Sequence, residues 1–128
     1  MQHRKLINDM TIKEVALIRQ CLGDIQNKKI KMTDHAKERS RKRKITEDEI
    51  IKCIKKGSII EVHHKRRDVR VLLRSDSKNR SICVVVDVIS ERIVTVYTNG
   101  INDTHESLHK EIYDSEFDIE SMILNYKR

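Results

Sequence analysis

The spacing of hydrophobic positions changes near residue 58, where a helical period gives way to an alternating one. Over residues 1–27 the apolar positions recur mostly three or four residues apart, which predicts one or two helices. Thr33 or Asp34 has the side chain to cap a further helix that runs to about Arg41. The first part of the chain is therefore predicted to be helical.

The next helix has the clearest boundaries in the sequence. Thr46 and Glu49 have the spacing of a capping box, and Ile50, Ile51 and Ile54 supply an apolar stripe behind it. Gly57 is typical of the residue at which a helix stops. We therefore predict a helix over residues 46–57.

Beyond this helix the apolar positions alternate with polar ones or run continuously, as in strands. Short polar turns separate four such segments, which lie at residues 58–63, 68–74, 81–89 and 92–98. We predict an α+β fold in which N-terminal helices precede a four-stranded antiparallel sheet. Apolar positions such as Ile112, Phe117 and Ile123 predict short C-terminal helices after the sheet.

Charge divides the chain into parts that match this prediction. Residues 28–74 hold 17 Lys and Arg against 7 Asp and Glu, whereas residues 101–128 hold 3 against 7. We predict an N-terminal helical extension at 1–30, an α+β core domain at 31–100 and an acidic helical tail at 101–128. The tail can cap the sheet, or it can fold against the basic face and screen it.

The balance of charges bears on partners and on compartment. A net charge of +7 in 128 residues favours a polyanionic partner. Cys21, Cys53 and Cys83 lie far apart and predict buried or free thiols in a reducing compartment. The sequence shows no apolar run of about 18 residues and no apolar signal segment, so we expect a cytoplasmic protein without a membrane partner.

Several short motifs in a fixed order resemble a known family. They are His35-Ala36-Lys37-Glu38-Arg39, Arg43, Ile45-Thr46, Ile50, Gly57 and Val94-Thr95-Val96-Tyr97. Over about residues 33–98 the chain resembles the domain-of-unknown-function family four-two-five-eight, which is related in layout to BrnT-type and RelE-type toxins. The resemblance implies the fold of small ribonucleases of the RelE and barnase–colicin type, with RNA on the sheet face that no helix covers. It also implies that His35, Arg39, a strand arginine and Thr95 converge on that face.

These residue types suit RNA cleavage without a cofactor, which needs a base, an acid and a cation at the phosphate. His35 can act as base or acid, since histidine is the side chain that ordinarily changes charge near neutral pH, and Arg39 lies one helical turn later. Arg70 and Arg74 share one face of a strand, and guanidinium groups match phosphate geometry. The predicted catalytic residues are therefore His35, Arg39, Arg70, Arg74 and Thr95.

Other basic residues are predicted to bind nucleic acid around this site. They are Arg41, Lys42, Arg43 and Lys44 in the basic run and Lys65, Arg66 and Arg67 at a hairpin tip, with Tyr97 able to stack on a base. Lys42 to Lys44 are also compatible with an ordinary solvated surface, and Arg70 and Arg74 with an exposed sheet face. His35 is compatible with a surface role too, in which case His63 or His64 can take its place.

One motif points to different chemistry. His105, Glu106 and His109 fit the HExxH pattern, in which two histidines on one helical face bind zinc and the glutamate acts as base. The motif follows a loop and has polar neighbours, so a zinc-dependent hydrolase is the minor alternative and no metal or other cofactor is predicted.

Three functions fit the sequence. The first is a toxin-like endoribonuclease with RNA as substrate, and the second is a non-catalytic nucleic-acid binder. The third is a protein-interaction module or inhibitor, in the style of a phage or mobile-element accessory protein. An antitoxin, a host protein or a second copy of the chain are the protein partners to be considered.

Overall fold

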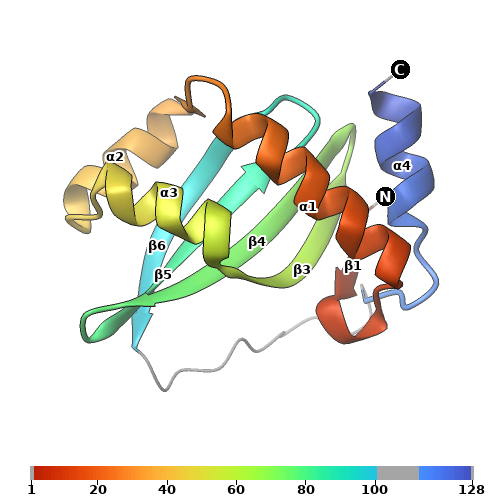
Figure 1. Ribbon diagram of the computed structural model, residues 1–128, viewed down its shortest axis with the longest axis horizontal. Coiled ribbons are helices and arrows are strands. Elements are labelled where there is room, and N and C mark those ends of the chain that lie inside the picture. The colour runs from red at the N-terminus through yellow and green to blue at the C-terminus, as the bar shows by residue number, and fades with distance from the viewer. Residues whose placement is uncertain (1, 101–112, 128) are drawn as a thin grey trace.

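The computed structural model describes residues 2–100 and 113–127. These residues form six strands in the order β1-β3-β4-β5-β6-β2 and four α-helices (Figure 1). The strands are β1 (Gln2–Leu6), β2 (Lys31–Met32), β3 (Ser58–Lys65), β4 (Asp68–Ser77), β5 (Arg80–Asp87) and β6 (Arg92–Gly100). The helices are α1 (Ile12–Gln26), α2 (Asp34–Lys42), α3 (Glu47–Lys56) and α4 (Ile119–Tyr126), with a short 3-10 turn at Ile7–Asp9.

The predicted fold, a RelE-like or barnase-like four-stranded antiparallel sheet preceded by helices, is wrong. The sheet is mixed and has two more strands: β1 pairs antiparallel with β3, and β2 pairs parallel with β6. The order also differs, because a strand precedes α1 and another precedes α2. Both added strands are short and depend on partners far along the chain, so their local residue pattern carries little information about them.

The predicted helix boundaries are confirmed at their caps. Thr33 Oγ1 accepts a hydrogen bond from the backbone of Ala36 at the start of α2. Thr46 and Glu49 form the reciprocal capping box of α3. Gly57 ends α3 at a point where a β-carbon would collide with the backbone oxygen of Cys53, so glycine is required there by close approach.

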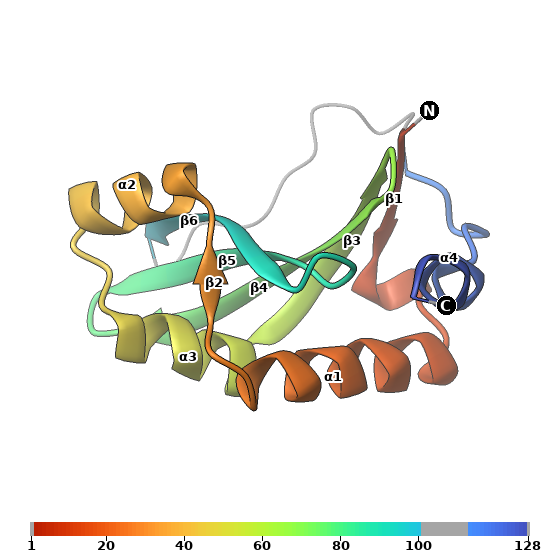
Figure 2. The ribbon, with the colours of Figure 1, turned by 90° about the horizontal axis from the view of Figure 1, so that it is seen from above.

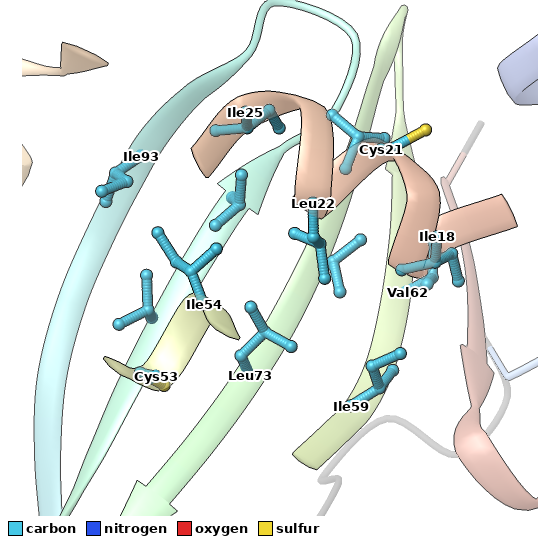
Figure 3. Packing of buried hydrophobic residues seen from close by; sticks show 14 of the residues in the cluster. Ile18, Cys21, Leu22, Ile25, Cys53, Ile54, Ile59, Val62, Leu73 and Ile93 are labelled. Atoms are coloured by element: carbon cyan, nitrogen blue, oxygen red, sulfur yellow. The ribbon is translucent and has the colours of Figure 1, made fainter. Parts of the chain in front are cut away.

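The hydrophobic core lies between one face of the sheet and the helices α1 and α3 (Figure 3). Ile18 and Leu22 of α1 and Ile54 of α3 are almost fully buried against this face. Val62 and Leu73 project from β3 and β4 into the same layer. Since side chains alternate along a strand, the residues between these core positions belong to the opposite face of the sheet.

The other two helices lie near the two edges of the sheet. Figure 2 shows α2 beside β6, on the opposite side of the sheet from α1 and α3. Helix α4 lies near the β1 edge and next to α1 (Figure 2). There Phe117 stacks on His3 and His64, with ring centroids 5.3 and 5.5 Å away. In residues 2–100 and 113–127, the helices all fall short of the length and apolar character that crossing a membrane requires.

Candidate functional site

A pocket of about 230 Å³ opens on the face of the sheet away from α1 and α3. Five strands contribute to it, from β1 at one edge to β6 near the other. Its lining residues are Arg4, Glu61, His63, Arg70, Leu72, Val85, Val94, Thr95 and Tyr97. The pocket therefore combines two guanidinium groups, an imidazole, a carboxylate and a hydroxyl pair with an apolar floor.

Strand register places His63 between two arginines. His63 of β3 lies opposite Arg4 of β1 on one side and opposite Arg70 of β4 on the other. Residues directly opposite each other in a sheet project to the same face. The imidazole therefore has a guanidinium group on each side.

This arrangement controls the charge of His63. Burial, followed by the positive charges of Arg4 and Arg70, lowers the pKa of His63 to about 4. At neutral pH the imidazole is therefore uncharged and has a nitrogen lone pair that can accept a proton. An anion bound near the two guanidinium groups would stabilise the imidazolium form and so raise the pKa of His63 toward the physiological range.

Each of the two arginines has one hydrogen-bond donor without an acceptor among the described residues. The Nε atoms of Arg4 and Arg70 are buried, and neither has a hydrogen-bond partner among the described residues. Other atoms of each side chain are held: Arg4 Nη1 donates to Glu61 Oε1 at 3.2 Å, and Arg70 Nη2 donates to Asp68 Oδ2 at 2.9 Å. A buried unpaired N–H costs about 1–3 kcal/mol, so an acceptor such as a phosphate oxygen would be stabilising here.

The far wall of the pocket comes from β6. A register shift of β6 against β5, at Val85 and Val86, lets the consecutive residues Val94 and Thr95 both line the pocket. Tyr97 is the next residue on the same face, and burial raises the pKa of its hydroxyl, which therefore remains protonated. This wall offers a hydroxyl donor and a ring beside apolar surface.

The predicted catalytic residues fall into two groups. Arg70 and Thr95 line the pocket, and Arg74 lies further along the same face of β4, where its Nη2 donates to the backbone oxygen of Gly100 at 3.0 Å. His35 and Arg39 are exposed on α2 and are not among the lining residues. The pocket lining therefore brings Arg70 and Thr95 together without His35, and the imidazole in that lining is the one of His63.

Arg4 and Glu61 are pocket residues that were not singled out from the sequence. Arg4 belongs to β1, where a helix was predicted, so its face could not be assigned. Glu61 and His63 flank Val62 in β3, and because side chains alternate along a strand, this spacing of two is the local signal that could have placed Glu61 on the pocket face.

The predicted nucleic-acid-binding residues lie at two places outside the pocket. Arg41 and Lys44 line a larger cavity of about 450 Å³ between α2 and α3. Lys42 pairs with Glu38 at 3.0 Å on the exposed side of α2, and Arg43 is exposed at its end. Lys65 ends β3, and Arg66 and Arg67 form the turn to β4, where the guanidinium of Arg67 lies 5.3 Å from the ring centre of Tyr126.

Metal chemistry has no candidate centre in the part of the chain that the structure describes. There, no group of three or more His, Cys, Asp or Glu side chains is arranged to hold a metal ion. The HExxH residues His105, Glu106 and His109 lie outside the described residues.

Comparison with protein-family models matches residues 32–98, just over half of the chain, to a family described as Domain of unknown function (DUF4258). Comparisons with curated proteins and with solved structures give no match. The matched region runs from β2 into β6. It therefore includes His63, Arg70 and Thr95 but leaves out β1 with Arg4 and the C-terminal segment, residues 113–127.

Proposed function

The chain belongs to the family described as Domain of unknown function (DUF4258), and since that description assigns no activity, we propose a function from the pocket itself. The protein engages RNA and cleaves it by acid–base chemistry of its own side chains, as BrnT-type and RelE-type toxins do. The single observation that supports this most is the pair of buried, unpaired Nε donors on the arginines that flank His63.

The two arginines favour a phosphodiester as the ligand of the pocket for electrostatic reasons. Arg4 and Arg70 supply two positive charges, and their unpaired Nε–H groups supply directed donors. The equatorial oxygens of a phosphorane carry more negative charge than those of the starting diester. The same donors therefore stabilise the transition state more than the ground state.

His63 supplies the base. Its neutral imidazole accepts the proton of the ribose 2′-OH, whose oxygen then bonds to phosphorus while the bond to the 5′-oxygen breaks. Water protonates the departing 5′-oxygen, and the imidazolium releases its proton to solvent before the next turnover. The products are a 2′,3′-cyclic phosphate and a 5′-hydroxyl end.

The wall formed by Thr95 and Tyr97 has the character of a nucleobase site. Leu72, Val85 and Val94 give it apolar surface, and Thr95 adds a hydroxyl group. Bases in single-stranded RNA bind proteins by stacking and by hydrogen bonds to their edges. We therefore assign the base next to the reacting phosphate to this wall.

Cleavage of a fluorescent RNA by purified variants tests the proposal. His63→Ala and Arg70→Ala should each lower the cleavage rate about 100-fold or more, in the range for loss of a general base or of a transition-state donor. His35→Ala is the matched control, because His35 is exposed on α2 and outside the pocket. It should leave the rate unchanged.

The substrate provides a second control. A strand of the same sequence with 2′-deoxyribose at every position lacks the attacking hydroxyl group and should bind without being cleaved. If the wild-type protein cleaves RNA no faster than His63→Ala does, the proposed ribonuclease activity is wrong.

Non-catalytic RNA binding is the second candidate function. The exposed cations at the end of α2 and at the β3–β4 turn favour it, since backbone charge neutralisation alone gives salt-dependent affinity. In that case His63→Ala binds RNA as tightly as wild type, and affinity falls steeply with salt in both proteins.

A further inference from the structure

The C-terminal segment reaches the pocket through Tyr113. The Tyr113 hydroxyl donates to Glu61 Oε2 at 2.7 Å, while the other oxygen of that carboxylate accepts from Arg4 at 3.2 Å. The backbone of Asp114 donates to the carbonyl oxygen of Arg4 at 2.8 Å, so residues 113–114 lie alongside β1. Glu61 is thus held from two sides by residues outside the matched family region.

The segment is anchored on the helix-covered side of the sheet as well. Lys5 Nζ donates to the carbonyl oxygen of Phe117 at 2.9 Å, and the backbone of Ile119 donates to Glu14 Oε2 at 2.8 Å. These contacts fix the path of the segment from β1 to α4 (Figure 1). These contacts also determine where Tyr113 lies, and they place its hydroxyl group within hydrogen-bond distance of Glu61.

We propose that Tyr113 is a positioning residue for the pocket. Its hydroxyl group holds the Glu61 carboxylate at Arg4 and keeps that carboxylate from turning toward His63. The proposal rests on the proposed function and adds what orients the Glu61 carboxylate in the pocket. Glu61 is almost fully buried and carries two oxygens that must each find donors. Arg4 donates to one of them and Tyr113 to the other, so the carboxylate is held at Arg4.

The charges around His63 determine what a turned carboxylate would do. Arg4 faces it from β1, Arg70 from β4, and Lys65, His64 and Glu61 share its own strand. All but Glu61 are cationic groups or a second imidazole. A carboxylate that moved onto the imidazole would stabilise its protonated form and so raise the pKa of His63.

Nuclear magnetic resonance titration of His63 in the full chain tests this without any need for cleavage. Tyr113→Phe should raise the pKa of His63 by about one unit, a tenfold change in proton affinity. Tyr126→Phe is the matched control, because Tyr126 belongs to the same segment but its hydroxyl lies 3.0 Å from His64 Nε2. It should shift the titration of His63 much less than Tyr113→Phe does, since it can act on His63 only through the neighbouring His64.

A second variant shows whether Tyr113 acts through Glu61. Glu61→Gln removes the charge that Tyr113 is proposed to hold, so adding Tyr113→Phe to it should shift the pKa of His63 no further. If His63 titrates alike in Tyr113→Phe and wild type, or if Tyr126→Phe shifts it equally, the proposal is wrong.

Activity gives an independent readout that separates the two proposals. In an RNA-cleaving protein, Tyr113→Phe should move the acid limb of the pH–rate profile by the same unit as the titration. A protein that cleaves no RNA yet shows the titration shift would refute the ribonuclease alone. One that cleaves RNA with an unshifted titration would refute only the role of Tyr113.

Discussion

Lys5 and Glu14 form a buried ion pair, with 2.8 Å between Nζ and Oε1 and about 5% of either side chain exposed. Glu14 also accepts from the backbones of Thr11 and Ile119, and Lys5 also donates to Phe117. The pair therefore joins β1, the start of α1 and the C-terminal segment at one point. The chain ends that supply Arg4 and Tyr113 to the pocket region are fastened here.

Breaking this pair should be costly. Glu14→Ala leaves the Lys5 ammonium buried without its counter-charge, so we expect the free energy of unfolding to fall by about 3–5 kcal/mol. Urea denaturation measures the change. The control is Glu38→Ala, which removes an ion pair to Lys42 that is more than half exposed. Such exposed pairs contribute little to stability because water and salt screen them, and equal losses in both variants would contradict the role assigned to Glu14.

Replacing Gly57 or Gly23 by alanine should change stability in opposite directions. Gly57→Ala would force a β-carbon against the Cys53 carbonyl oxygen and to 3.2 Å from that of Arg74, so we expect a loss of about 1–3 kcal/mol. Gly23→Ala meets no atom within 4 Å in helix α1 and should gain about 1 kcal/mol. Thermal unfolding of both variants checks the contrast, which fails if Gly57→Ala melts at or above wild type.

Glu49 should make the free energy of unfolding depend on pH in the acid range. The backbone hydrogen bond from Thr46 outweighs burial and, with Ser77 and Arg80, lowers the pKa of Glu49 to about 2 from an ordinary 4.5. A lowered folded-state pKa means that the stabilisation is complete above pH 4.5 and is lost as pH falls toward 2. Glu49→Gln should lower stability by about 1 kcal/mol at pH 7 and flatten this dependence.

Glu47→Gln is the control for Glu49, since Glu47 lies in the same first turn of α3 but is exposed. It should change stability less and leave the acid dependence in place. Denaturant titrations at a series of pH values between 2 and 7 separate the two variants. Parallel pH curves for wild type and Glu49→Gln would show that Glu49 does not cause the dependence.

The cysteines should be inert in the folded protein. Cys21, Cys53 and Cys83 are free and buried, and burial raises the pKa of the Cys53 thiol to about 11. Since the thiolate is the reactive form, a thiol reagent at pH 8 should label the native protein slowly and label all three thiols quickly in denaturant. Rapid labelling of the native protein would contradict the packing.

Phosphate binding should be visible at His63. A nucleoside 3′-monophosphate places a negative charge between Arg4 and Arg70 and should raise the pKa of His63 by about one unit or more. The nucleoside without its phosphate should not. Arg70→Ala should weaken the effect, and an unchanged titration in saturating nucleotide would place the phosphate elsewhere.

The sequence predicted what local chemistry determines. The caps at Thr33 and Thr46 and the four central strands depend on neighbouring residues, and their positions agree with the structure to within a few residues. The strand β1 was predicted as helix, because Leu6 and Ile7 continue an apolar spacing that leads into α1. Pairing with β3, almost sixty residues away, overrides that local pattern.

The same distinction explains the candidate site. Arg70 and Arg74 were placed on one face of their strand because alternation along a strand fixes a side, whereas the meeting of a strand arginine with Thr95 was only what the family resemblance implied. Choosing between His35 and His63 required knowing which element crosses the open face, and that depends on topology. Tyr113 carried no signal at all, since its partner Glu61 lies 52 positions earlier in the chain.

Arg80, at the start of β5, has a consequence for how the protein assembles. Its guanidinium donates to the backbone oxygens of Arg43 and Lys44, 37 and 36 positions earlier, and also to Glu49. Lys44 has a left-handed backbone with φ 54°, which is unfavourable for lysine without such support. During synthesis the corner between α2 and α3 therefore lacks its clamp until β5 has emerged. In the finished molecule the amides of this corner should exchange with solvent only when the β4–β5 hairpin opens, as one cooperative unit.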